Sequence, residues 1–413
     1  MIKPIHRLIA ARHMPIFNLA GFLCCLFVVL ATASCSLNRE TESKTAADSI
    51  AYYKFPAPKP LSEPEMKAYR QACENWYDST IKPSNFNGGI LVARNGQVIF
   101  ERYNGTGHIG QADSITANTP THIASVTKTF TAMAVLKLVE EDSLKLDEEL
   151  VTYLPGFNYP GVTVRDLLNH RSGLPNYLYF MDELGWDKKK FMTNQDVFDY
   201  MVTNKNKIKN ISAAGRHFSY CNTNYVLLAL LVEKITGLSY PQYIHKVFFA
   251  PFQMKNSFVF TAADSNRVNP SYDWRGDIIP QNHLDHVYGD KNIYSTTYDL
   301  LIWDRALRSG LVFKPGTLDL AYTGYSNEKP GIRNYGLGWR MNIYPDGKKI
   351  IYHNGWWHGN NASFIRLLEE DVTIIAIGNR FCRCIYKAKN LAGIFNPSFM
   401  QVSEDEADSS ASK

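Results

Sequence analysis

Residues 123–132 of this 413-residue chain read IASVTKTFTA and open a segment whose apolar residues recur at helical spacing. The spacing predicts a helix over residues 125–140. Ser125 stands at its start and Lys128 one turn later, so their side chains are expected on one face of the helix. A lysine can take a proton from a serine hydroxyl when burial or a nearby cation lowers the lysine pKa from about 10.4. The pair therefore predicts either a serine nucleophile with its base, or a helix N-cap followed by a surface lysine.

The Ser-x-x-Lys spacing is not rare in this sequence, and only its context singles out Ser125. It occurs four times, at residues 79–82, 125–128, 326–329 and 410–413. A proline directly follows the first and the third, which prevents either from continuing as a helix. The fourth lies in a polar, acidic tail. We therefore expect the chemistry at the start of the 125–140 helix.

Strand-like runs lie towards both ends of the chain, with helical segments between them. Residues 89–93 and 97–102 are apolar runs joined by an Asn-Gly pair, which predicts a hairpin. Later runs predict strands at residues 335–341, 349–352, 362–367 and 372–378. Further helices are predicted at residues 65–77, 225–236 and 297–308. This order predicts an α+β fold, in which early and late strands form one antiparallel sheet flanked by helices. The middle helices form a second lobe, and the site lies between the two.

The composition is that of an ordinary globular protein. Apolar residues make up 45% of the chain and charged residues 20%, which excludes a disordered, collagen-like or multi-span membrane protein. Lys and Arg exceed Asp and Glu by 44 − 39 = 5, and no run of Lys or Arg forms a basic stripe. We therefore expect no nucleic-acid partner.

Residues 1–34 are expected to be a signal peptide. A basic start precedes an apolar run over residues 19–31, which is too short to span a bilayer comfortably. Ser34-Cys35 resembles the end of a bacterial lipoprotein box, which predicts a lipid on Cys35. Ordinary cleavage before Ser34, giving a soluble periplasmic protein, is the alternative. The protein is thus expected in the bacterial cell envelope, periplasmic and anchored to the membrane through Cys35.

Two polar segments flank the predicted folded part of the chain. Residues 35–64 contain four prolines and predict a linker. Residues 397–413 form an acidic tail that we expect to be disordered. The folded domain is expected over residues 65–396.

The cysteines suggest neither a disulfide framework nor a zinc site. Beyond the leader and Cys35 they are Cys73, Cys221, Cys382 and Cys384, and their spacing completes no zinc-binding set with histidine, so we expect no metal. We expect buried or free thiols. A disulfide between Cys73 and one of the late pair is the alternative in an oxidising envelope.

Five segments, in order along the chain, are similar to those of one family. They are residues 123–132 (IASVTKTFTA), 167–175 (LLNHRSGLP), 218–228 (FSYCNTNYVLL), 293–300 (IYSTTYDL) and 353–355 (HNG). Together they resemble the serine β-lactamase-related hydrolases, a group that holds class C β-lactamases, D-alanyl-D-alanine carboxypeptidases, and related esterases and D-amino-acid peptidases. The resemblance covers roughly residues 86–379. It implies a β-lactamase/transpeptidase-like fold, a hydrolase domain over residues 65–396 and no cofactor.

The resemblance also implies which residues carry out the reaction. Ser125 would be the acylated nucleophile, while Lys128 and Tyr220 would share the proton transfer. Asn222 would orient Lys128 and hold a substrate amide. A second Tyr-x-Asn match, at residues 325–327, runs into a Pro-Gly turn, whereas Tyr220 leads into a predicted helix.

The last segment would bind the substrate. The backbone N–H groups of Ser125 and Trp356 would form the oxyanion hole, and Gly355 would let the substrate approach. His353 stands where penicillin-recognising relatives carry a lysine that pairs with the substrate carboxylate. An unperturbed imidazole is charged only below a pH of about 6.5. His170, in the second segment, is expected to be structural.

Together these features predict an envelope serine hydrolase that forms an acyl-enzyme. The departure at His353 favours a peptidase or esterase over an efficient β-lactamase. Its substrates would be small esters or peptides, such as D-amino-acid peptides. A non-catalytic or penicillin-binding sensor lipoprotein that keeps the fold is the alternative.

Overall fold

The computed structural model of the protein describes residues 51–400. The predictions for the signal peptide, for Cys35, for the start of the linker and for residues 401–413 lie outside the described residues. Pro397–Met400 forms a 3₁₀ turn and buries Phe399, so the ordered chain continues past the predicted end of the domain at residue 396.

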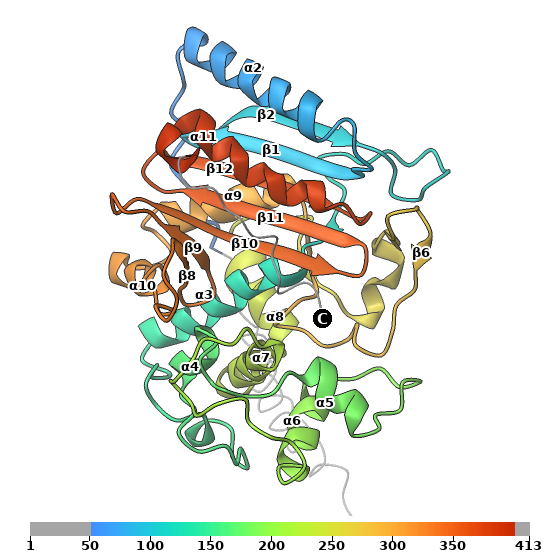
Figure 1. Cartoon of the computed structure of the whole chain (residues 1–413), viewed down its shortest axis with the longest axis vertical. Coiled ribbons are helices and arrows are strands. Elements are labelled where there is room, and N and C mark those ends of the chain that lie inside the picture. The colour runs from blue at the N-terminus through green and yellow to red at the C-terminus, as the bar shows by residue number, and fades with distance from the viewer. Residues whose placement is uncertain (1–50, 401–413) are drawn as a thin grey trace, which may run out of the picture. The chain divides into compact units, whose positions relative to one another are not determined.

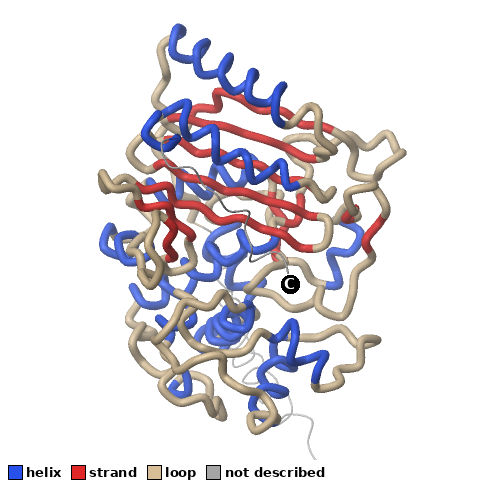
Figure 2. The backbone as a smooth tube through the Cα atoms, in the orientation of Figure 1, coloured by secondary structure: helices blue, strands red, loops and turns tan. Residues whose placement is uncertain are grey.

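A seven-stranded antiparallel sheet forms one half of the fold (Figures 1 and 2). Its strand order is β2-β1-β12-β11-β10-β9-β8, so the N-terminal hairpin pairs with strands from the end of the chain. The strands are β1 (Gly88–Arg94), β2 (Gln97–Asn104), β8 (Arg333–Tyr335), β9 (Arg340–Ile343), β10 (Lys349–Trp357), β11 (Asn360–Leu367) and β12 (Val372–Gly378). The expected joining of early and late strands in one sheet is confirmed.

Both faces of this sheet are buried, which explains the nearly continuous apolar sequence of β12. Ile374 and Ala376 pack under α2 (Glu63–Thr80) and the 3₁₀ segment Arg383–Leu391. Ile375 and Ile377 face the opposite way, towards the core that contains α9 (Thr297–Arg308) and α3 (Thr127–Glu140).

The predicted strand over residues 335–341 is wrong in its middle. The chain there leaves β8, turns through residues 336–339 and returns as β9. Gly338 has a φ of +84°, and a Cβ on it would lie 2.2 Å from the Cβ of Ala132. The turn therefore needs a glycine because its backbone lies against α3.

Helices form the second half of the fold around α3 (Figure 1). They are α4 (Val164–Leu168), α5 (Tyr177–Glu183), α6 (Asn194–Thr203), α7 (Asn222–Thr236), α8 (Tyr240–Ile244) and α10 (Pro315–Ala321), with α11 (Ala392–Phe395) lying on the sheet side. Short strands β3 (Thr121–His122), β4 (Phe258–Val259) and β7 (Ile293–Ser295) form a small sheet, and β5 (Ser271–Tyr272) pairs with β6 (Ile278–Ile279).

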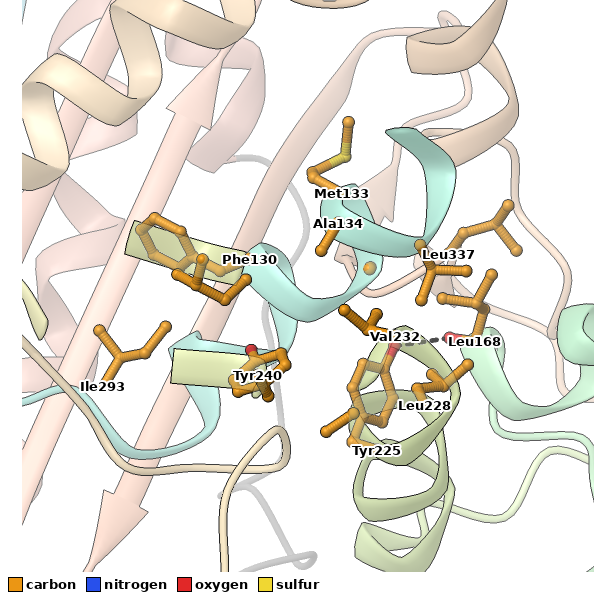
Figure 3. Close-up of a cluster of buried hydrophobic side chains, with 14 of the residues drawn as sticks. Phe130, Met133, Ala134, Leu168, Tyr225, Leu228, Val232, Tyr240, Ile293 and Leu337 are labelled. Atoms are coloured by element: carbon orange, nitrogen blue, oxygen red, sulfur yellow. Dashed lines mark hydrogen bonds between the residues drawn. The ribbon is translucent and has the colours of Figure 1, made fainter. Parts of the chain in front are cut away.

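The core between α3 and α7 fixes the helix that carries the Ser-x-x-Lys pair. Phe130 and Met133 of α3 and Leu228 of α7 belong to one buried cluster (Figure 3). The Tyr225 hydroxyl donates to the Leu168 carbonyl at 2.7 Å, a bond that also appears in Figure 3 and ties α7 to α4. Helix α3 therefore packs against α7, which is itself tied to α4.

The cysteines differ in part from the expectation. Cys73 and Cys221 are buried free thiols, as predicted. Cys382 and Cys384 form a disulfide with each other, so their interpretation as thiols is wrong, and Cys73 does not pair with either. Their Cα atoms lie 5.2 Å apart because the chain turns between them at the start of the 3₁₀ segment, within the usual disulfide range.

No helix within residues 51–400 combines the length and the apolar character that crossing a membrane requires.

Candidate active site

Ser125 lies at a sharp junction between the small sheet and α3. A single 3₁₀ turn, Ala124–Val126, separates β3 from the α-helix, so the α-helix begins two residues later than predicted. Ala124 has a φ of +47°, a left-handed conformation that costs a non-glycine residue roughly 1–2 kcal/mol. Strained backbone of this kind concentrates at functional sites, where the surrounding structure enforces it.

Lys128 is buried and bonded to Ser125, which excludes the interpretation as a surface lysine. Its ammonium donates to the Ser125 Oγ at 3.0 Å and to the backbone carbonyl of Asp290 at 2.8 Å. The Asp290 carbonyl thus fixes the ammonium against the hydroxyl. A serine hydroxyl and a lysine nitrogen within hydrogen-bond reach form the pair that acyl transfer requires, with the lysine as proton acceptor when its amine is neutral.

Strand β10 passes beside Ser125 with part of one edge open. Strand β9 pairs only with Lys349–Tyr352 of β10, so within residues 51–400 no strand covers that edge over residues 353–357. A Cβ on Gly355 would lie 2.3 Å from the Ile123 carbonyl oxygen and 3.1 Å from the Ser125 nitrogen. Glycine is therefore required for the strand to approach the serine this closely.

Trp356 follows on the same strand, and its side chain is 44% exposed. Its indole N–H donates to the His358 carbonyl at 2.7 Å, and its ring lies 6.0 Å from that of Phe381. The predicted contribution of its backbone N–H to an oxyanion hole stays a prediction.

Two cations lie near the ring of Tyr220. The Lys128 ammonium lies 5.0 Å from the centroid of its ring, and the Arg340 guanidinium carbon lies at the same distance of 5.0 Å. The sequence reasoning missed Arg340, which belongs to no motif and reaches the site only because β9 begins beside β10.

The second Tyr-x-Asn match lies elsewhere. The Tyr325 hydroxyl donates to the Leu320 carbonyl at 3.2 Å, and the Tyr325 carbonyl accepts a bond from Arg171 at 2.8 Å. Tyr220, and not Tyr325, is the tyrosine whose ring Lys128 contacts.

Asn222 is the first residue of α7 and is partly buried. Among the described residues, the hydrogen bonds of the Lys128 ammonium go to Ser125 and Asp290, not to Asn222. The predicted orientation of Lys128 by Asn222 is thus not formed in this structure, and the contact of Asn222 with a substrate amide stays a prediction.

His353 is buried, with both ring nitrogens in use. Nδ1 lies 2.7 Å from the Asn354 carbonyl, so it carries the proton, and Nε2 accepts from the Tyr335 hydroxyl at 3.2 Å. Burial, followed by the charges of Arg340 and Lys128, holds the pKa of His353 well below its usual value. The expectation that His353 becomes charged just below pH 6.5 is therefore wrong.

The described part of the chain holds no group of three or more His, Cys, Asp or Glu side chains arranged to bind a metal ion.

A mixed α+β fold in which a buried lysine is bonded to a partly buried serine at the start of α3 defines a serine hydrolase of the β-lactamase/transpeptidase-like class. The chain belongs to the Beta-lactamase family, whose family model matches residues 82–383. The recognition made from the five sequence segments is thereby confirmed.

Two curated relatives show how far the similarity extends. Penicillin-binding protein 4* of Bacillus subtilis (strain 168) is 29% identical over 333 residues, which cover 75% of this chain and 72% of that protein. A D-aminopeptidase of Brucella anthropi is 27% identical over 340 residues, 79% of this chain. The match spans only 63% of that enzyme, less than two thirds of its length.

Solved structures share the fold. A penicillin-binding protein from Bacillus halodurans aligns with a TM-score of 0.68 at 20% identity, over 76% of this chain and 97% of that one. A D-stereospecific amidohydrolase from Streptomyces sp. aligns with a TM-score of 0.58 at 21% identity, over 78% of this chain and 98% of that one. The β-lactamase/transpeptidase-like fold expected from the sequence is confirmed.

Proposed function

We propose that this serine hydrolase acts in the bacterial envelope on small esters or peptides, such as D-amino-acid peptides, through a covalent acyl-enzyme on Ser125. The observation that carries the proposal is the 3.0 Å hydrogen bond between the buried Lys128 ammonium and the Ser125 hydroxyl, beside the open edge of β10. The relatives named as a D-aminopeptidase and a D-stereospecific amidohydrolase support the choice of substrate class.

The reaction would proceed in two halves. The Ser125 hydroxyl gives its proton to the Lys128–Tyr220 pair as Oγ bonds to the substrate carbonyl carbon, and the carbonyl oxygen becomes an oxyanion. The backbone N–H groups of Ser125 and Trp356 would hold that oxyanion. Its collapse breaks the bond to the leaving amine or alcohol, which takes the proton from the pair. Water then repeats the steps, releasing the acid and restoring Ser125.

The neutral residue at position 353 favours a peptidase or esterase over an efficient β-lactamase. His353, which stands where penicillin-recognising relatives carry a lysine, is buried and neutral. Arg340 is the permanent cation beside Tyr220, and its side chain is partly exposed. Arg340 would therefore attract the carboxylate of a peptide substrate.

The nucleophile is tested by replacing it. Ser125→Ala should abolish hydrolysis across a panel of D- and L-aminoacyl amides and small esters, because losing such a nucleophile typically costs several orders of magnitude in kcat. A fluorophosphonate probe should label Ser125 in the unaltered protein and leave the variant unlabelled. Ser326→Ala, in the third Ser-x-x-Lys match, is the control and should keep full activity. Activity retained by Ser125→Ala would contradict the proposal.

The location is tested separately at Cys35. Cys35→Ser should move the protein from the membrane fraction to the soluble envelope fraction, because an acyl chain contributes about 0.8 kcal/mol of membrane binding per buried CH₂. Metabolic labelling with a palmitate analogue should mark the unaltered chain alone. If the variant stayed attached to the membrane, the lipid anchor would be refuted, whereas the hydrolase proposal would be unaffected.

A further inference from the structure

We propose that His170, expected from the sequence to be structural, is the positioning residue that holds Tyr220 beside Lys128 and Arg340. The inference rests on the proposed function, in which Tyr220 shares the proton transfer with Lys128.

The backbone on both sides of Tyr220 is bonded to His170. The N–H of Ser219 donates to the His170 carbonyl at 2.8 Å. The N–H of Cys221 donates to the His170 Nδ1 at 3.2 Å. The two amides that flank Tyr220 are therefore tied to one residue, which fixes where the Tyr220 side chain leaves the backbone.

The imidazole also packs against the Tyr220 ring. The two ring centroids lie 4.3 Å apart, and His170 is fully buried. The Lys128 ammonium and the Arg340 guanidinium each lie 5.0 Å from the same tyrosine ring. Side-chain packing and backbone bonds thus act together on one tyrosine.

Two features of His170 are energetically unfavourable, and a residue that only fills space would need neither. Its φ of +58° is left-handed, a conformation that glycine or asparagine adopts more easily. Its Nε2 is buried without a hydrogen-bond partner in the described structure. A strained residue with an unsatisfied polar atom, retained beside a reactive group, points to a role beyond stability.

His170 acts through its position and not through charge. Burial, and next the charge of Lys128, lowers the pKa of His170 well below its usual value, so the ring is neutral. Because Nδ1 accepts a hydrogen bond, the proton lies on Nε2. The other titratable groups around the two rings are also held neutral by burial: His353, Cys221, Tyr225 and Tyr335. The charged groups that face Tyr220 are therefore Lys128 and Arg340.

His170→Asn separates the positioning role from the backbone role. Asparagine tolerates a left-handed backbone, and its Oδ1 can take the place of Nδ1 in accepting the Cys221 N–H. The variant lacks the imidazole ring, which packs on Tyr220 at 4.3 Å and, at longer distances, on Phe218, Tyr225 and Tyr335. A Tyr220 ring that moves away from Lys128 breaks the pair that transfers the proton, so the pH–rate profile should change in shape and not only in height.

The measurement is kcat/KM of the full chain against pH. We expect the loss of kcat/KM in His170→Asn to differ between pH 7 and pH 9, because the altered pair is the one that carries the proton. Loss of folded protein would lower the rate by one common factor at both pH values. His245→Asn, the same substitution at an exposed position, is the control and should leave the profile unchanged. A pH-independent loss, or none, in His170→Asn would overturn the inference.

A double-mutant cycle adds a second readout. If His170 acts through Tyr220, His170→Asn should cost nothing further in a Tyr220→Phe background, where the hydroxyl is already absent. An equal loss in both backgrounds would overturn the inference. If His170→Asn does not fold, NMR spectroscopy of the unaltered protein provides the test instead. NOEs between the His170 and Tyr220 rings are expected, and their absence would overturn it.

These outcomes remain distinct from a failure of the proposed function. If Ser125→Ala kept its activity, the nucleophile would be wrong. If the probe labelled Ser125 but His170→Asn left the pH profile unchanged, only the positioning role of His170 would be refuted.

Discussion

Arg340 shows how a single charge outside every motif can alter the expected chemistry. The motif position that commonly carries a lysine holds His353, whose ring is buried and whose nitrogens bond to Tyr335 and Asn354. The positive charge near Tyr220 instead comes from Lys128 and from Arg340 on the neighbouring strand. Recognition of a substrate carboxylate would then depend on β9 and not on residue 353.

Replacing Arg340 with methionine should therefore weaken the preference for acidic substrates. We expect the ratio of kcat/KM for matched acid and ester substrates at pH 8 to fall about 5- to 20-fold, the value of a charge-assisted hydrogen bond of about 1–2 kcal/mol. The ratio is the quantity to measure, because any effect of the change on Tyr220 applies to both substrates. Arg333→Met, an exposed arginine on β8, is the matched control. An unchanged ratio in Arg340→Met would remove Arg340 from the substrate site.

At the scale of single elements, β10 has two functions along its length. Lys349–Tyr352 pairs with β9, whereas the residues after Tyr352 pair only with β11. The change occurs where the strand reaches Ser125. Gly355 is the point of contact, since a side chain there would meet the Ile123 carbonyl at 2.3 Å.

Gly355→Ala should accordingly damage both stability and activity. The added methyl group meets backbone atoms that cannot move cheaply, so we expect a loss of about 1–3 kcal/mol in the free energy of unfolding. A displacement of β10 by about 1 Å should lower kcat about 100-fold. Urea unfolding and steady-state kinetics measure the two effects.

Gly316→Ala is the matched control for that experiment. Gly316 lies within α10, where a Cβ would meet nothing within 4 Å. Alanine there should stabilise the protein by about 0.5–1 kcal/mol. If Gly355→Ala were as harmless as Gly316→Ala, β10 would not approach Ser125 closely in solution.

Local sequence patterns predicted an element well where the whole pattern, including its start or stop residues, lies within that element. Helix α9 occupies the predicted residues, and α7 ends at Gly237, whose φ of +70° suits a C-cap. The hairpin of β1 and β2 turns at Asn95 and Gly96, both with positive φ. The strand predicted over residues 335–341 was wrong because Gly336 and Gly338 form a turn. That turn is required by close contacts with Ala321 of α10 and Ala132 of α3, which the local sequence does not reveal.

At the scale of the whole molecule, the linear motifs could not reveal what the topology brings together. Ser125, Lys128 and Gly355 follow from short patterns, and the structure places them in contact. The Asp290 carbonyl that holds Lys128 and the Arg340 charge come from other elements. Their contribution depends on the strand order of the sheet and on the packing of α3, neither of which leaves a signal in neighbouring residues.

Three buried histidines make the stability of the whole fold depend on pH. Burial, as the largest effect, lowers the pKa of His122 to about 4 and holds the pKa values of His170 and His353 well below the usual value. In the unfolded chain each would titrate near 6.5. Below that pH the unfolded chain binds more protons than the folded protein, so the free energy of unfolding falls as pH falls and is fully retained above it.

Urea unfolding at pH 7.5 and pH 5.5 should therefore differ by up to about 4 kcal/mol, since each histidine contributes up to about 1.4 kcal/mol per pH unit. His122→Asn removes one of the three groups while its Oδ1 can still accept the Ala124 N–H that His122 Nδ1 accepts at 3.0 Å. That variant should lose about a third less stability over the same pH interval. His245→Asn, at an exposed position, should behave like the unaltered protein. Equal losses in His122→Asn and the unaltered protein would mean that His122 is not held neutral in the folded state.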